Sequence, residues 1–167
     1  MPHTRAAAVM LLTVGLAGCG SLSGCTAPPS EGTASPSVGT SPPSLGNPTT
    51  FAADLEAGVN AARVAEGLPE LAHADCAVEL AAERAADLVG NPDLPHAPMD
   101  AVLAGCGVGV AGENLSRATL PAGDVVDAWL GSPGHRSNIL DTQFWASGVA
   151  CLPDGEALVC SHVFLGD

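Results

Sequence analysis

Residues 129–140 read WLGSPGHRSNIL, and they break the chain with Ser-Pro-Gly between a tryptophan and a histidine. Ser132 suits the cap of a new helix, and Pro133 suits its first position. His135 then falls in the first helical turn, where the helix dipole disfavours a positive charge and favours a neutral imidazole. Such a side chain is either a metal ligand or general base, or a structural histidine bonded to nearby backbone.

The composition limits the classes of function. The chain has 167 residues, enough for one domain of ordinary size, and carries a formal net charge of −13. All 5 basic residues are arginine, and no basic stripe is present. Because nothing can neutralise a run of phosphates, we expect no nucleic-acid partner. The same charge argues against electrostatic docking on anionic lipid.

Residues 1–18 have the pattern of a bacterial lipoprotein signal peptide. A short basic start precedes an apolar run that is shorter than the ~20 residues that span a bilayer. The LAGC sequence that follows resembles a lipobox, so we expect lipid at Cys19. We therefore expect the protein to be exported and held on the outer face of the cell membrane. Cys25, in LSGC, is the alternative anchor.

Residues 19–50 are expected to form a tether, since proline, serine, threonine and glycine dominate residues 26–50. The folded domain is then 51–167. Its apolar spacing predicts helices over 51–67 and 76–89 and a third from Pro121, with Thr49 and Thr50 as candidate caps for the first.

Short alternating segments follow the helices. Residues 147–152 and 157–164 predict an antiparallel hairpin around a Gly155-Glu156 turn, and 107–115 could be another strand. Helices followed by strands, without regular βαβ alternation, indicate an α+β fold.

Four cysteines lie in the expected domain, and an even number in an exported domain favours two disulfides. Three pairings are open. We prefer Cys151 with Cys160, because the hairpin sets them opposite each other, which leaves Cys76 with Cys106.

Two other side chains are candidates for chemistry. Glu113, in AGENLSRA (111–118), is either a paired carboxylate facing a cleft or a surface turn residue. His96, in a loop with three prolines, is otherwise an exposed loop histidine. Glu79, Glu83 and Asp87 repeat at helical spacing and predict a solvated face.

AGENLSRA followed by VVDAWLGSPGHRSNIL (125–140) resembles the bacterial branch of the CAP superfamily, also called SCP domains. The resemblance extends across 51–167 and implies a three-layer α–β–α sandwich with a central antiparallel sheet and a cleft. It implies that His96, Glu113 and His135 face the cleft as ligands of a divalent metal such as zinc. The family's second acidic position is Ser132 here, and Trp129 and Asn114 support the cleft.

Two histidines and one carboxylate would suit a catalytic zinc, and so a metal-dependent hydrolase acting on peptides or cell wall. Against this reading, the chain has no HExxH helix and no second carboxylate at the family position. CAP domains are mostly regarded as non-enzymatic scaffolds, some of them lipid-binding. The resemblance therefore favours a surface module that binds a small lipid, a cell-wall component or a protein. A purely structural protein is the third alternative.

Overall fold

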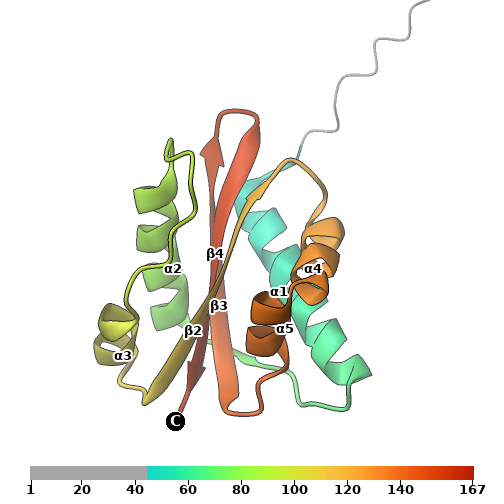
Figure 1. Cartoon of the computed structure of the whole chain (residues 1–167), viewed down its shortest axis with the longest axis vertical. Helices are drawn as coiled ribbons and strands as arrows, with labels where there is room; N and C mark the ends of the chain where they lie inside the picture. Colours follow the sequence, from blue (N-terminus) through green and yellow to red (C-terminus); the bar gives the residue numbers. More distant parts are fainter. Residues whose placement is uncertain (1–44) are drawn as a thin grey trace, which may run out of the picture. The chain divides into compact units, whose positions relative to one another are not determined.

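The computed structural model describes residues 45–167, which form three layers (Figure 1). The expected signal peptide and both candidate anchors, Cys19 and Cys25, lie outside these residues. The elements, in chain order, are α1 (Pro48–Ala65), β1 (Ala72–His73), α2 (Asp75–Leu88), α3 (Asp100–Cys106), β2 (Val110–Ala118), α4 (Ala122–Gly131), α5 (Pro133–Leu140), β3 (Phe144–Asp154) and β4 (Ala157–Gly166). No helix in this part of the chain is long and apolar enough to cross a membrane.

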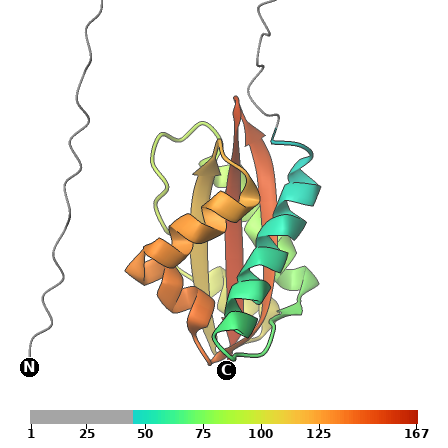
Figure 2. The same ribbon diagram turned by 90° about the vertical axis from the view of Figure 1, so that its right-hand side faces the viewer.

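A sheet of order β1-β3-β4-β2 forms the middle layer. Helices α2 and α3 cover one face, and α1, α4 and α5 cover the other (Figures 1 and 2). The three long strands are antiparallel, and the two-residue β1 runs parallel to β3. The α–β–α sandwich expected from the sequence is confirmed. Strand β2 lies at one end of the sheet, so only one of its edges is paired.

The β3–β4 hairpin turns at Gly155 and Glu156, as expected. Gly155 has φ +65°, the left-handed conformation that two-residue hairpin turns favour. This register sets Cys151 directly opposite Cys160, and a disulfide joins them across a Cα–Cα distance of 4.1 Å. A second disulfide joins Cys76 of α2 to Cys106 of α3.

Small residues let the helices approach the sheet closely. Ala77 is fully buried on α2. A Cβ atom at Gly148 of β3 would collide with the backbone of Val78. The core can therefore be compact although the chain has only 3 Phe and 2 Trp.

The start of the domain differs from the expected boundary. Helix α1 begins at Pro48, and the Asn47 side chain accepts a hydrogen bond from the Thr49 N–H at 2.8 Å. Asn47 is therefore the cap, instead of Thr49 or Thr50, because Pro48 is suited to the first helical position. Residues 48–50, expected in the tether, are helical, and Leu45 already packs against the core.

Other boundaries also differ. Pro121 takes the cap position, and α4 begins at Ala122. Strand β2 occupies 110–118 instead of 107–115, since Gly107 ends α3 in the left-handed conformation. Helix α3 was not predicted, because seven residues make too few turns for a readable apolar period.

Candidate functional site

Strand β2 sends the side chains of the Gly-Glu-Asn motif to both faces of the sheet. Glu113 contacts Arg84 of α2, whereas Asn114 contacts α5, as the alternation along a strand requires. Phe144 and Asn138 pack closely against Gly112. A Cβ atom at this position would lie 2.9 Å from the Phe144 ring and 3.2 Å from Asn138 Oδ1, so only glycine fits without a shift.

The Glu113 carboxylate is buried and makes contacts through both oxygens. Its Oε1 lies 3.2 Å from Arg84 Nε and accepts a hydrogen bond from the Ser161 hydroxyl at 3.0 Å. Its Oε2 lies 2.9 Å from His96 Nδ1. The Arg84 guanidinium also donates to the Pro95 carbonyl, which ties the His96 loop to α2. These residues, Glu113, Arg84, His96 and Ser161, form the Glu113 cluster.

The contacts of Glu113 bear directly on the divalent metal that the family resemblance implies. Among residues 45–167, no three His, Cys, Asp or Glu side chains are grouped as metal ligands. Arg84 already supplies a positive charge to Glu113, so a metal would have to displace a buried cation. The residues as folded do not fit a three-ligand metal site, and zinc binding stays a prediction of the sequence.

Hydrogen bonds to β2 fix the helix that carries His135. Asn114 is fully buried, and its Nδ2 donates to the His135 carbonyl at 3.1 Å. Asn138 Nδ2 lies 3.0 Å from the Glu113 carbonyl and 2.9 Å from Asn114 Oδ1. Ser132 occupies the cap position of α5 without a side-chain hydrogen bond. The motif asparagines therefore hold α5 against β2.

The His135 ring lies beside the Trp129 ring, with centroids 6.4 Å apart. Its Nδ1 is buried and has no hydrogen-bond partner in the described part of the chain. Burial lowers the pKa of His135, and the nearby His96 lowers it further. The imidazole is therefore neutral at neutral pH.

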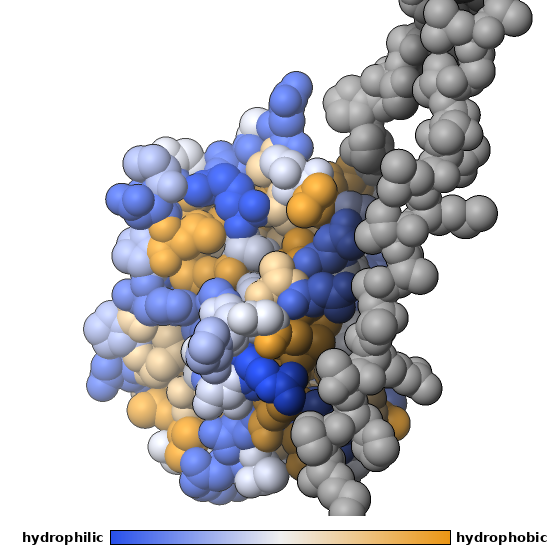
Figure 3. All heavy atoms as spheres, turned by 45° about the vertical axis from the view of Figure 1, so that its right-hand side comes forward, coloured by the Kyte–Doolittle hydropathy of each residue, from blue (hydrophilic) through white to orange (hydrophobic). Residues whose placement is uncertain are grey.

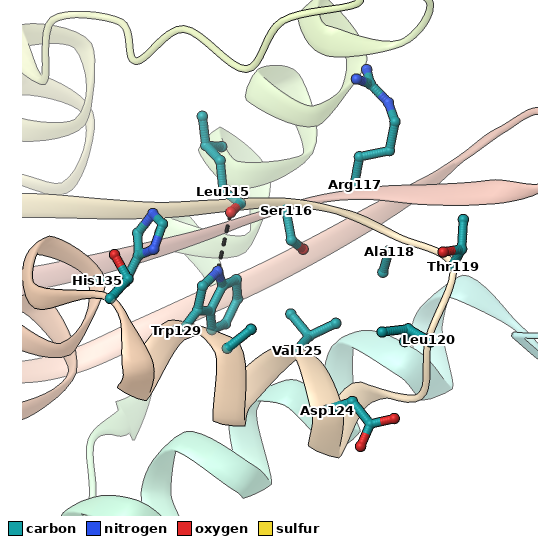
Figure 4. A pocket seen from close by; sticks show the side chains of 12 residues that line it. Leu115, Ser116, Arg117, Ala118, Thr119, Leu120, Asp124, Val125, Trp129 and His135 are labelled. Atoms are coloured by element: carbon teal, nitrogen blue, oxygen red, sulfur yellow. Dashed lines mark hydrogen bonds between the residues drawn. The ribbon is translucent and has the colours of Figure 1, made fainter.

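His135 also borders a groove between β2 and α4, with a volume of about 370 Å³. We name it the β2–α4 groove; it is lined by Leu115, Ser116, Arg117, Ala118, Thr119, Leu120, Asp124, Val125, Ala128, Trp129, Ser132 and His135. Figure 4 shows Ser116 pointing toward α4 and Arg117 pointing away from it. The Ser116 hydroxyl is buried and has no hydrogen-bond partner among the described residues.

Trp129 closes the inner end of this groove. Its indole N–H donates to the Leu115 carbonyl at 3.0 Å (Figure 4). The indole ring also lies near the His162 ring of β4, with centroids 6.0 Å apart. Burial lowers the pKa of His162 to about 3, so this histidine is neutral.

The sequence interpretation missed four of these side chains: Arg84, Ser116, Ser161 and His162. Arg84, Ser161 and His162 lie in segments that predicted only a helix or a strand, whereas Ser116 lies in the AGENLSRA motif, where only Glu113 and Asn114 were singled out. The segment 157–164 offered one signal, because Ser161 and His162 interrupt an apolar run and are fully buried with it. A buried polar side chain is expected to have a partner or a role.

The fold and its two motifs define the class of the protein as an SCP-type α–β–α domain. The motifs are the Gly-Glu-Asn segment of β2 and the Ser-Pro-Gly-His segment at the start of α5. The Cysteine-rich secretory protein (CAP) family matches residues 57–164, and the chain belongs to that family. No curated protein sequence matches the chain at a significant level.

Solved structures share the fold. An extracellular protein containing an SCP domain from Bacillus anthracis has a TM-score of 0.62 and 23% identity, over 71% of this chain and 41% of that one. A cysteine-rich secretory protein from Staphylococcus aureus has a TM-score of 0.62 and 17% identity, over 73% of this chain and 40% of that one. An outer surface protein from Borrelia burgdorferi has a TM-score of 0.61 and 20% identity, over 72% and 95%. This chain therefore spans less than half the length of the first two.

Proposed function

We propose that this protein is an exported, non-enzymatic binding module whose ligand site is the β2–α4 groove. The observation that carries the proposal is a largely apolar groove whose lining residues Ser116 and His135 each have a buried polar atom without a hydrogen-bond partner among the described residues, Ser116 Oγ and His135 Nδ1. Its volume of about 370 Å³ lies within the range of small-ligand sites. A ligand with an apolar body and a hydrogen-bonding group would satisfy both kinds of surface.

The Glu113 cluster supports binding over hydrolysis. A general base needs a carboxylate with access to water or substrate, whereas both Glu113 oxygens contact protein groups. The second acidic position of the family is Ser132, which has no carboxylate. No arrangement of the described residues favours the metal-dependent hydrolase.

Apolar surface is divided into separate patches on the face shown in Figure 3, with hydrophilic residues between them. Isolated apolar surface of this kind is ordinary for a monomeric protein, so a polar group must give a site its specificity. The proposed ligand is a small lipid, a cell-wall component or a protein segment.

A screen of small amphiphilic fragments by protein-observed NMR tests this proposal. We expect saturable shifts at the Ser116 and Ala128 amides. Ala128→Trp should abolish them, because Ala128 is an exposed groove residue whose enlargement fills the space. Fragments that bind only elsewhere, or bind Ala128→Trp equally well, would remove the groove as the ligand site.

We also propose export and lipid anchoring at Cys19, which the LAGC sequence supports. The Bacillus anthracis and Borrelia burgdorferi structures are described as extracellular and outer surface proteins. Cys19→Ser should move the protein from the membrane fraction to the medium, and Cys25→Ser should not. Release by Cys25→Ser alone would transfer the anchor to that residue.

A further inference from the structure

The outer edge of β2 is closed at one end and open at the other. Beyond the edge, Asn138 and Trp129 donate to the Glu113 and Leu115 carbonyls. In an antiparallel strand at the edge of a sheet, every second residue directs both its N–H and its C=O away from the sheet. Arg117, which follows in this alternation, therefore also points its N–H and C=O outward.

The outward peptide groups of Arg117 have no hydrogen-bond partner in the described part of the chain. The Leu115 N–H faces the same way and also has none. Both residues line the β2–α4 groove. An unpaired strand edge is a template for an added strand, and here it lies beside an apolar wall of α4.

The charged side chains around the groove indicate what kind of ligand it favours. The Arg117 guanidinium is turned toward Asp154, at 2.6 Å, so it does not supply a positive charge to the groove. Asp124 lines the groove on α4 and has no ion pair within the described chain. His135 is neutral. The Asp124 carboxylate points away from β2 (Figure 4), so the outer rim of the groove carries one negative charge without an ion pair among the described residues, in a chain of net charge −13.

We propose that an extended peptide with a positive side chain binds along the outer edge of β2 as an additional strand. Its main chain exchanges hydrogen bonds with the Arg117 N–H and C=O and accepts from the Leu115 N–H. A cationic side chain lies beside Asp124, and apolar side chains pack on Val125 and Ala128. This inference rests on the proposed function of the groove and names the class of its ligand.

The test is an NMR titration of the 15N-labelled protein with acetyl-Val-Thr-Lys-Thr-Val-amide, whose two valines and lysine share one face of an extended strand. We expect saturable shifts centred on Leu115, Arg117 and Thr119. Methylating alternate peptide nitrogens should weaken binding by roughly tenfold, because main-chain hydrogen bonds are lost. Asp124→Asn should weaken binding by roughly two- to fivefold, the range of one exposed ion pair. Asp127→Asn, on the same helix but outside the groove, should not.

Equal binding of the methylated peptide, of a glutamate-for-lysine copy, or no shift along β2 would overturn the proposal. The fragment screen separates the two claims. If fragments occupy the groove and the peptide does not, the peptide proposal fails while the groove keeps its function. If neither binds, both fail.

Discussion

Arg84 Nε lies 3.2 Å from Glu113 Oε1, so a cation on α2 neutralises the carboxylate of the Gly-Glu-Asn motif. The Arg84 side chain is 15% exposed and that of Glu113 is 2% exposed. The contact is ionic, since the Arg84 Nε–H lacks hydrogen-bond alignment. A motif carboxylate that the family resemblance assigns to a metal is here part of an ion pair that joins two layers.

Breaking this pair should be costly. Arg84→Met leaves the buried Glu113 without its cation, and we expect a loss of about 3 kcal/mol in the free energy of unfolding. Arg136→Met is the matched control, because the Arg136–Glu66 pair is 44% and 52% exposed and should contribute less than about 1 kcal/mol. Urea denaturation of both variants measures the difference. Equal effects would contradict a structural role for the Arg84–Glu113 pair.

Arg63 is a second buried cation, 1% exposed, which joins α1 to the α5–β3 connection. Its guanidinium donates to the carbonyls of Pro69, Ile139, Asp141 and Phe144, at 2.8–3.2 Å. Arg63→Lys keeps the charge but cannot reach this fork of acceptors, so we expect a loss of about 3 kcal/mol. Thermal and urea unfolding measure it. A variant as stable as the parent would show that water or lysine replaces these bonds.

The two tryptophans should respond differently to substitution. Trp129→Phe leaves the Leu115 carbonyl without its donor and should cost about 1–2 kcal/mol. Trp145→Phe should cost less than about 0.5 kcal/mol, since Trp145 is 50% exposed. Denaturation followed by circular dichroism compares them. The reverse order would place Trp145, instead of Trp129, in the structural role.

Stability should fall in mild acid because of His162. Its folded pKa is about 3, below the ~6.5 of an unfolded histidine, so the unfolded state binds more protons between these values. Stability is therefore full above pH ~6.5 and declines below it, by roughly 2 kcal/mol at pH 5 from this group. His135 shifts in the same direction.

Urea denaturation between pH 7 and 5 tests this dependence, with His162→Leu as the variant that should flatten it. NMR of the parent gives a second readout that does not depend on the variant's folding. The His162 ring signals should not titrate between pH 7 and 5. A midpoint near pH 6 would show that the ring is accessible to solvent.

The parts that the sequence predicted correctly depend on local pattern. The Gly155-Glu156 turn sets the register that brings Cys151 to Cys160, and helical periods locate α1, α2 and α4. The Arg84–Glu113 pair depends instead on how α2 packs against β2, which no local pattern contains. Arg84 looked like one more charge on a solvated helix, and only the packed sandwich shows its partner.

The β2–α4 groove could not be predicted from the sequence for the same reason. Ser116 and His135 belong to different elements, and they line one groove only after α4 and α5 fold onto β2. Asn114 was expected to support the cleft, but its partners in α5 could not be predicted. Edges of sheets are fixed by strand order, which a single sequence does not reveal.

We propose that Glu113 is committed to its ion pair with Arg84, while ligands bind in the β2–α4 groove. A calorimetric zinc titration of the parent protein, with His96→Ala and His135→Ala beside it, tests whether Glu113 is free to bind a metal. We expect no saturable heat in the parent and no difference between the parent and either variant. Saturable zinc binding that both variants lose would contradict it, because zinc would then have displaced Arg84 from Glu113.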